Sequence, residues 1–169
     1  MNIKAIRSDE IYRKMMTATN EEKENIYRYE LMKPFEFKWQ FMQWNPNITP
    51  ADMIVSEGLA ENFAASMFGE DKIGKWVTET SAKTLETVIK PMIKANLTES
   101  DRGKLSSFLC GDEIMAMRGG VAVGMPYCGG YACGYALIAH YLKKTGKSIF
   151  EATITSTTDI LKETEDFWN

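Results

Sequence analysis

The chain has 169 residues, of which 44% are hydrophobic and 25% are charged, the balance of a globular domain with its own core. A net charge of -3 and the lack of any five-residue block of Lys and Arg argue against nucleic acid as a partner. No run of eighteen apolar residues occurs, and the start of the chain leads into charged sequence, so we expect neither a membrane span nor a cleaved export signal. Three cysteines give no even disulfide framework, which favours a reducing, cytoplasmic location.

Helical periodicity begins close to the start of the chain. Its spacing predicts two helices between residues 8 and 32, the second ended by Pro34. Residues 35–44 are rich in aromatic side chains and fit neither the helical nor the strand period. Thr49 followed by Pro50 has the form of a helix cap and a first helical proline, and Gly69 is typical of a helix end. These signals predict a helix over residues 50–68.

Shorter helical segments fill the second half of the chain. We expect helices near residues 80–96, 100–109, 112–117, 130–144 and 157–167, and a loop over 119–126. Pro91 would kink the first of them, and Gly146 would end the 130–144 helix. No segment alternates long enough to predict a strand. The sequence therefore predicts one mainly α domain in which helix 50–68 packs against helix 130–144.

Two carboxylates stand out in the helix expected over residues 50–68. At about 100° per residue, Glu57 and Glu61 fall within an apolar arc, opposite a polar cluster. The arc contains Met53, Ile54, Gly58, Ala60, Ala64, Ala65, Met67 and Phe68, and the polar cluster contains Asp52, Ser56, Asn62 and Ser66. Buried carboxylates need a cation, a metal or several donors, which indicates a binding role. Alternatively, both acids reach the rim of the core and pair with Arg or Lys, or share a proton.

A second cluster lies in the glycine-rich segment that opens the 130–144 helix. Tyr131 and Tyr135 are one turn apart, so both phenols can project from one face of that helix. A phenol can stabilise an oxyanion or donate to a buried carboxylate. The alternative is plain core packing, with glycines that let a neighbouring backbone approach closely.

The cysteines and the single histidine do not form a catalytic or metal-binding pattern by themselves. Four residues separate Cys128 from Cys133, and with Cys110 they do not complete a thiolate site. His140 follows Cys133 by seven residues, about 10 Å along a helix, which excludes a Cys–His nucleophile pair. On the helical wheel His140 projects opposite the two tyrosines, so we expect a solvated surface histidine.

Two segments together resemble a bacterial family, the DUF2268 predicted zinc-dependent peptidases. They are residues 52–63, DMIVSEGLAENF, and residues 126–135, PYCGGYACGY. The resemblance covers both ends of the chain. It implies a single domain over residues 1–169, with an N-terminal helical segment at 1–38 and a helical, peptidase-like C-terminal part at 39–169. The fold class implied is a helical bundle corresponding to the C-terminal helical part of a zincin-like fold.

Members of that family look like gluzincins, in which an HExxH helix supplies two histidine ligands and a general-base glutamate. A glutamate on a later helix supplies the third ligand and leaves zinc a position for water. The resemblance implies that Glu57 matches this third metal ligand. It implies that Glu61, one turn on, accepts a hydrogen bond that orients a ligand histidine. Tyr131 or Tyr135 would then be the donor toward the substrate carbonyl or its oxyanion.

The HExxH motif does not occur in this chain, and one histidine cannot form it. The family pattern places that helix just before the aromatic stretch 39–44, so we interpret the chain as shortened near residues 38–39. We expect an inactive relative without a bound cofactor, where the family would use zinc. The first alternative is an intracellular protein that binds a small molecule or peptide around Glu57. The second is a peptidase completed by a partner chain. An exposed former cleft would favour a homo-oligomer.

Overall fold

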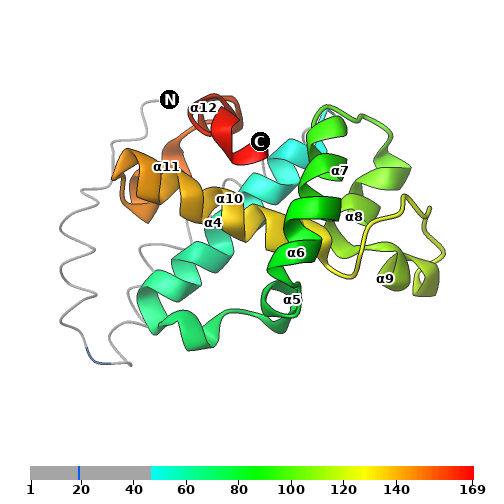
Figure 1. The fold of residues 1–169 in the computed structure, drawn as a ribbon, viewed down its shortest axis with the longest axis horizontal. Coiled ribbons are helices and arrows are strands. Elements are labelled where there is room, and N and C mark those ends of the chain that lie inside the picture. The colour runs from blue at the N-terminus through cyan, green and yellow to red at the C-terminus, as the bar shows by residue number, and fades with distance from the viewer. Residues whose placement is uncertain (1–18, 20–46) are drawn as a thin grey trace.

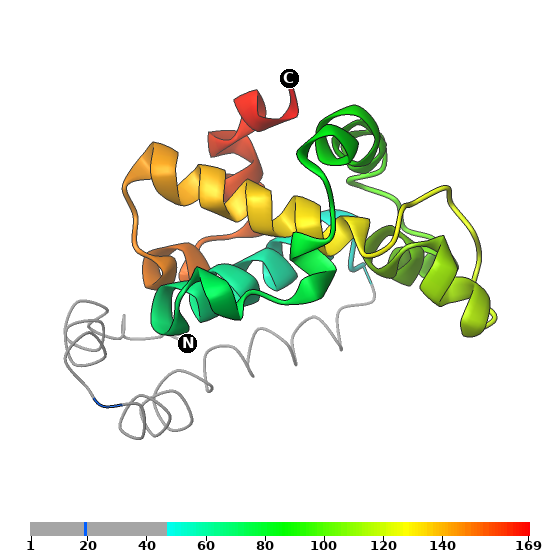
Figure 2. The ribbon, with the colours of Figure 1, turned by 60° about the horizontal axis from the view of Figure 1, so that its bottom comes forward.

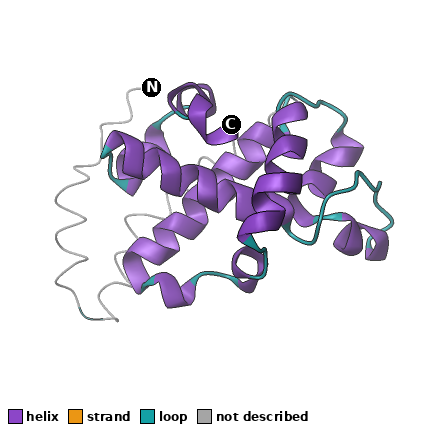
Figure 3. Ribbon diagram, in the orientation of Figure 1, coloured by secondary structure: helices purple, strands orange, loops and turns teal. Residues whose placement is uncertain are grey.

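The computed structural model describes Thr19 and residues 47–169 (Figure 1). Every regular element in residues 47–169 is helical, and none of these residues forms a strand (Figure 3). The mainly α prediction is therefore confirmed. The helices expected within residues 8–32 and the aromatic stretch 35–44 lie outside the described residues. No helix formed by residues 47–169 has the length and apolar character needed to cross a bilayer.

Helix α4, Pro50–Phe68, has the bounds expected from its end signals. Thr49 and Asp52 form a capping box: the Asp52 carboxylate accepts the Thr49 N–H at 3.1 Å, and the Thr49 hydroxyl accepts the Asp52 N–H at 3.3 Å. At the other end, Gly69 has a φ of 101°, which a residue with a side chain rarely adopts. Local chemistry at both ends thus defines this helix.

Helix α10, Gly129–Thr145, packs across α4 in the centre of the molecule (Figures 1 and 2). The two helices meet at Gly58 and Gly134. A Cβ atom on Gly58 would overlap the carbonyl oxygen of Gly134, and a Cβ atom on Gly134 would overlap that of Ile54. Backbone therefore contacts backbone at this crossing, and the predicted pairing of the two helices is confirmed.

The segment expected as one helix over residues 80–96 consists of three consecutive elements. They are α6 (Ala82–Thr84), a π-helical turn η3 (Leu85–Ile89) and α7 (Lys90–Ala95). Pro91 has no N–H to donate to the carbonyl of residue 87, and its ring would crowd that carbonyl in a regular α-helix. The wider turn, in which the Lys90 N–H donates to the Leu85 carbonyl, accommodates the proline.

The remaining elements are short. Between α4 and α6 lie a 3-10 turn η2 (Glu70–Lys72) and α5 (Lys75–Thr78); α8 (Arg102–Cys110) and α9 (Asp112–Met117) precede α10. After α10 come α11 (Ile149–Ile154), α12 (Thr157–Glu163) and a 3-10 turn η4 (Glu165–Trp168). The prediction of one helix over 157–167 was therefore too long. The sequence analysis missed α5 and α11, although Ser148 and Glu151 form a capping box at the start of α11.

The buried face of α4 differs from the predicted arc. Asn62, assigned to the polar side, is buried, whereas Ala60 and Phe68, assigned to the apolar side, are exposed. The Asn62 side-chain amide donates to the Gly58 carbonyl at 2.8 Å and to the Tyr135 carbonyl at 2.9 Å. Apolar residues occur on most sides of α4, so the wheel alone does not fix its orientation. The contact with α10 determines which side of α4 is buried.

Candidate functional site

Glu57 and Glu61 lie at the edge of the buried face of α4, and both are half-buried rather than enclosed. The Glu61 carboxylate has two donors from the start of α5: the Trp76 indole N–H at 2.7 Å and the Gly74 backbone N–H at 3.2 Å. These hydrogen bonds hold α5 against α4. Glu61 therefore has a structural role in this chain, whatever else it contacts.

Glu57 has a different environment from Glu61. Among residues 47–169, no group donates a hydrogen bond to its carboxylate or forms an ion pair with it. Burial raises the pKa of Glu57 above its ordinary value, and the negative charge of Glu61 raises it further. No fully buried side-chain oxygen in the described part of the chain lacks a partner, so the Glu57 oxygens remain in contact with solvent. Within residues 47–169, Glu57 is therefore a partly desolvated acceptor without a donor.

Tyr131 of α10 lies close to Glu57. Burial raises the pKa of the Tyr131 phenol well above its usual range, and the charge of Glu57 adds to this. The Tyr131 ring contacts the edge of the Trp76 ring, with 6.4 Å between their centroids. We call the surface formed by Glu57, Glu61, Trp76 and Tyr131 the Glu57 face.

Tyr135 is placed one turn further along α10. Burial raises the pKa of its phenol, and the negative charges of Glu70 and Glu61 raise that pKa further. Tyr135 thus lies within electrostatic range of Glu70 and Glu61, and Tyr131 within range of Glu57. Within the described residues, neither phenol donates a hydrogen bond to Glu57 or Glu61. The structure brings both tyrosines to the two acids, as helices that cross at Gly58 and Gly134 require.

His140 lies on the opposite side of α10. Its Nε2 is 3.1 Å from an Asp166 carboxylate oxygen, and its ring centroid is 5.7 Å from that of Phe167. The sequence predicts a solvated surface histidine, but only 33% of the His140 side chain is exposed. The difference arises because η4 folds back onto α10. His140 packs against η4, the C-terminal turn, and does not face Glu57.

The three cysteines are buried free thiols. Burial raises the pKa of the Cys133 thiol to about 12, and it raises the pKa of Cys110 and Cys128 as well. Across residues 47–169, no group of three or more His, Cys, Asp and Glu side chains is arranged to hold a metal ion. Sequence reasoning missed Trp76 and Gly74, the donors to Glu61, because no local pattern connects them to α4.

Comparison with known proteins shows which family the chain belongs to. The model of a family described as "Predicted Zn-dependent protease (DUF2268)" matches residues 35–162. The "Uncharacterized protein YjfC" of Bacillus subtilis (strain 168) is 32% identical over 107 residues. This match covers 63% of the chain but only 36% of the relative, so the chain spans little more than a third of that protein. No solved structure matches. Because the family model covers well over half of its residues, the chain belongs to the DUF2268 family of predicted zinc-dependent proteases.

Proposed function

We propose that this chain is a non-catalytic member of its family, which binds a peptide or small molecule at the Glu57 face. The observation that carries the proposal is the position of His140. It is the one histidine in the sequence, and it lies across α10 from Glu57, paired with Asp166. A peptidase site of the expected kind needs two histidines beside the third ligand.

The donors of this chain do not fit a zinc site built on Glu57. Two histidines one turn apart cannot be supplied by a sequence with a single histidine. The nearest carboxylate along α4, that of Glu61, already accepts hydrogen bonds from Trp76 and Gly74. Within residues 47–169, Glu57 belongs to no group of three or more side chains that could hold a metal. The general-base glutamate of an HExxH motif is absent from the sequence as well.

The Glu57 face still has the chemistry of a binding surface. It presents a partly desolvated carboxylate without a partner among residues 47–169, next to the Tyr131 phenol and to Trp76, a residue that is 44% exposed. An apolar wall with a few convergent polar groups is typical of ligand sites. Trp76 of α5 contacts both ends of this surface, because its indole N–H donates to Glu61 and its ring packs against the Tyr131 ring. A ligand that donates a hydrogen bond and carries an apolar group fits this surface.

The proposal is tested by metal analysis together with a hydrolysis assay. After dialysis against zinc-free buffer, we expect far less than one equivalent of zinc per chain by mass spectrometry. We also expect no chelator-sensitive hydrolysis of casein. Glu57→Gln should change neither result. Stoichiometric zinc that survives dialysis, together with hydrolysis that a chelator abolishes, would overturn the non-catalytic proposal.

A second candidate is a peptidase completed by a partner chain, and the free carboxylate of Glu57 favours it. A glutamate kept half-buried without a partner among residues 47–169 would be ready to bind a metal held by histidines from another polypeptide. Complexes isolated from the native host distinguish the two candidates. If a partner chain completes the peptidase, these complexes should contain about one zinc per chain. Glu57→Ala should remove this zinc. Glu165→Gln, at an exposed position, is the control and should leave it bound. Pairing of two copies through the Glu57 face stays a prediction.

A further inference from the structure

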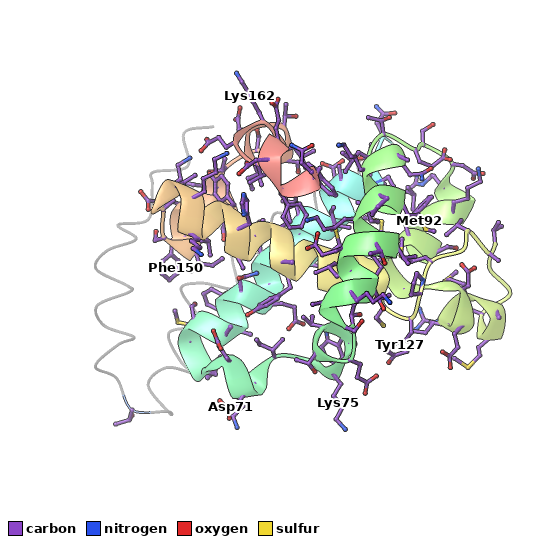
Figure 4. All side chains as sticks on the ribbon, in the orientation of Figure 1. Asp71, Lys75, Met92, Tyr127, Phe150 and Lys162 are labelled. Carbon is purple, nitrogen blue, oxygen red and sulfur yellow. The ribbon has the colours of Figure 1, made fainter. Side chains whose placement is uncertain are left out.

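The C-terminal turn η4 covers a surface of the molecule that is separate from the Glu57 face. Figures 1 and 4 show this turn beside α10 and α7, while Lys162 of the preceding helix α12 points outward. We call the surface beneath η4 the η4 face. Its contact residues are Lys90 and Lys94 of α7 with His140 and Lys144 of α10. Nothing in the proposed function uses this face.

The η4 face is built from two pairs of basic residues. Lys90 and Lys94 are one helical turn apart on α7, and His140 and Lys144 are one turn apart on α10. Residues four apart share one side of a helix, so each helix presents its pair to the segment that lies between them. The face is therefore basic in a chain whose net charge is -3. A basic surface favours an acidic ligand.

An aromatic side chain is the anchor of this contact. Phe167 is only 7% exposed, and its ring centroid lies 4.3 Å from the Lys90 ammonium. Lys90 itself is 8% exposed, and its ammonium is 2.7 Å from a Glu86 carboxylate oxygen. An ammonium that is withdrawn from water attracts an aromatic ring more strongly than an exposed one does. A buried aromatic anchor of this kind commonly dominates the binding of a peptide.

The residue before the anchor supplies a negative charge. One oxygen of the Asp166 carboxylate is 3.1 Å from His140 Nε2, and the other bonds to the Lys144 ammonium. The hydrogen bond from Lys144 lowers the pKa of Asp166, which keeps this acid ionised at neutral pH. On the other helix, the Lys94 ammonium donates to the Trp168 carbonyl at 3.3 Å. The face thus contacts an acid and the aromatic residue that follows it.

The turn η4 can open more easily than the helix before it. Of residues 165–168, only Phe167 is buried. An exposed ion pair such as the one between Asp166 and Lys144 contributes little to stability, and elements with few buried contacts open at low cost. In α12, by contrast, Ile160 is fully buried, as is Thr164 just after it. The turn can therefore leave the face while α12 stays in place.

We propose that the η4 face binds a peptide segment of another protein in which an acidic residue directly precedes an aromatic one. Residues 165–168 occupy the face as an internal ligand and must open before a partner binds. A second copy of the chain is a poor source of this segment, because its exchange would also require α12 to leave the core. The tethered segment has an effective concentration on the order of millimolar. A free peptide therefore binds measurably when the internal segment is weakened.

The test is a titration of the full chain with the fluorescein-labelled peptide Glu-Thr-Glu-Asp-Phe-Trp-Asn, the sequence of residues 163–169. Binding is followed by fluorescence anisotropy at low ionic strength. Phe167→Ala empties the anchor position, so we expect this variant to bind the peptide saturably, at least about tenfold more tightly than the unmodified chain. A peptide with alanine in place of phenylalanine should bind this variant at least about tenfold more weakly.

Two lysines on α10 provide a matched pair of variants, each added to Phe167→Ala. Lys144→Glu and Lys143→Glu reverse one positive charge at neighbouring positions, but Lys144 contacts Asp166 whereas Lys143 is exposed. We expect Lys144→Glu to weaken binding at least about fivefold and Lys143→Glu by less than about twofold. If circular dichroism shows that Phe167→Ala is unfolded, Asp166→Lys replaces it, because this exposed position leaves no cavity. That variant should also bind more tightly than the unmodified chain.

The proposal is overturned if no folded variant binds the peptide saturably. It is equally overturned by binding that the alanine peptide retains, or that the two lysine reversals weaken to the same extent, because either result places the peptide elsewhere. Glu57→Gln should leave the binding unchanged, and the titration requires neither zinc nor hydrolysis. It can therefore fail while the proposed function stands, and the reverse is also true.

Discussion

At the scale of single residues, two glutamates one turn apart on α4 differ in what they contact. Glu61 accepts hydrogen bonds from Trp76 and Gly74, and it thereby connects α4 to α5. Glu57 is partly desolvated and has no hydrogen-bond partner within residues 47–169. A carboxylate in that state favours its protonated form more than it would in water. Keeping Glu57 ionised at neutral pH therefore costs free energy of folding, and the proposed binding role of Glu57 stays a prediction.

Glu57→Gln tests this reading of the residue. The raised pKa of Glu57 means that its protonated form stabilises the fold; this contribution is complete below the ordinary pKa of 4.5 and is lost as pH rises through the folded-state value. Glutamine resembles the protonated acid. We therefore expect the variant at pH 7 to be as stable as the unmodified chain, or more stable by less than about 1 kcal/mol, in urea unfolding. Below pH 4.5 this difference should vanish.

The opposite result for Glu57 has a clear meaning. A loss of more than about 3 kcal/mol at pH 7 would show a buried glutamate with a specific partner, as expected when one member of a buried charge pair is removed. That outcome would contradict the partly open Glu57 face.

At the scale of elements, the crossing of α4 and α10 positions the candidate site. Gly58 and Gly134 bring the helix axes close, and this proximity places Tyr131 near Glu57 and Tyr135 near Glu61. The buried amide of Asn62 joins the two helices by donating to the Tyr135 carbonyl. Small residues at the crossing thus determine which side chains share the Glu57 face.

Gly58→Ala and Gly134→Ala test the crossing. Each added methyl group would overlap a backbone carbonyl oxygen, so relief requires movement of a whole helix rather than of a side chain. We expect each variant to lose about 3 kcal/mol of unfolding free energy, the upper end of the usual range for overpacking, measured by urea denaturation. Gly103→Ala in α8 is the control. Its nearest outside atom is an Asp101 carboxylate oxygen at 3.2 Å, and alanine should be neutral or stabilise the helix by up to about 1 kcal/mol. Equal effects at Gly58 and Gly103 would contradict the close crossing.

At the scale of the whole molecule, the C-terminal turn closes one side of the core. Phe167 of η4 is buried, His140 contacts its ring, and the Lys90 ammonium lies 4.3 Å from the ring centroid. Asp166 bonds to His140 from the same turn. The single histidine in the sequence thus lies on a face remote from Glu57 and takes part in the packing of η4 on α10.

The burial of all three thiols gives a prediction for the folded molecule. Cys110, Cys128 and Cys133 are buried, and burial raises the pKa of each, so little reactive thiolate forms at neutral pH. With Ellman's reagent at pH 8 we expect the native thiols to react at least about tenfold more slowly than in urea, where all three should react. The melting temperature should be the same with and without a reductant. A native thiol that reacts as fast as free cysteine would contradict this packing.

The sequence by itself determined the ends of the two long helices, α4 and α10, and the family. The Thr49–Asp52 capping box, Gly69 and Gly146 act within about four residues, so their chemistry can be read along the chain. The two motifs around Glu57 and Tyr131 predicted the family that the match over residues 35–162 shows. The packing of α4 on α10 also followed from sequence.

Only the tertiary structure decided how those helices are oriented and which groups the acids and the histidine contact. Trp76 is 15 residues from Glu61, and Asp166 is 26 residues from His140, so no local pattern links them. The orientation of α4 depended on Asn62, whose buried amide is satisfied by a carbonyl 73 residues away. Periodicity ranks residues by polarity and so assigned Asn62 to solvent. A polar group becomes a core residue when the fold supplies its hydrogen bonds, and that condition is set by the packing of distant segments.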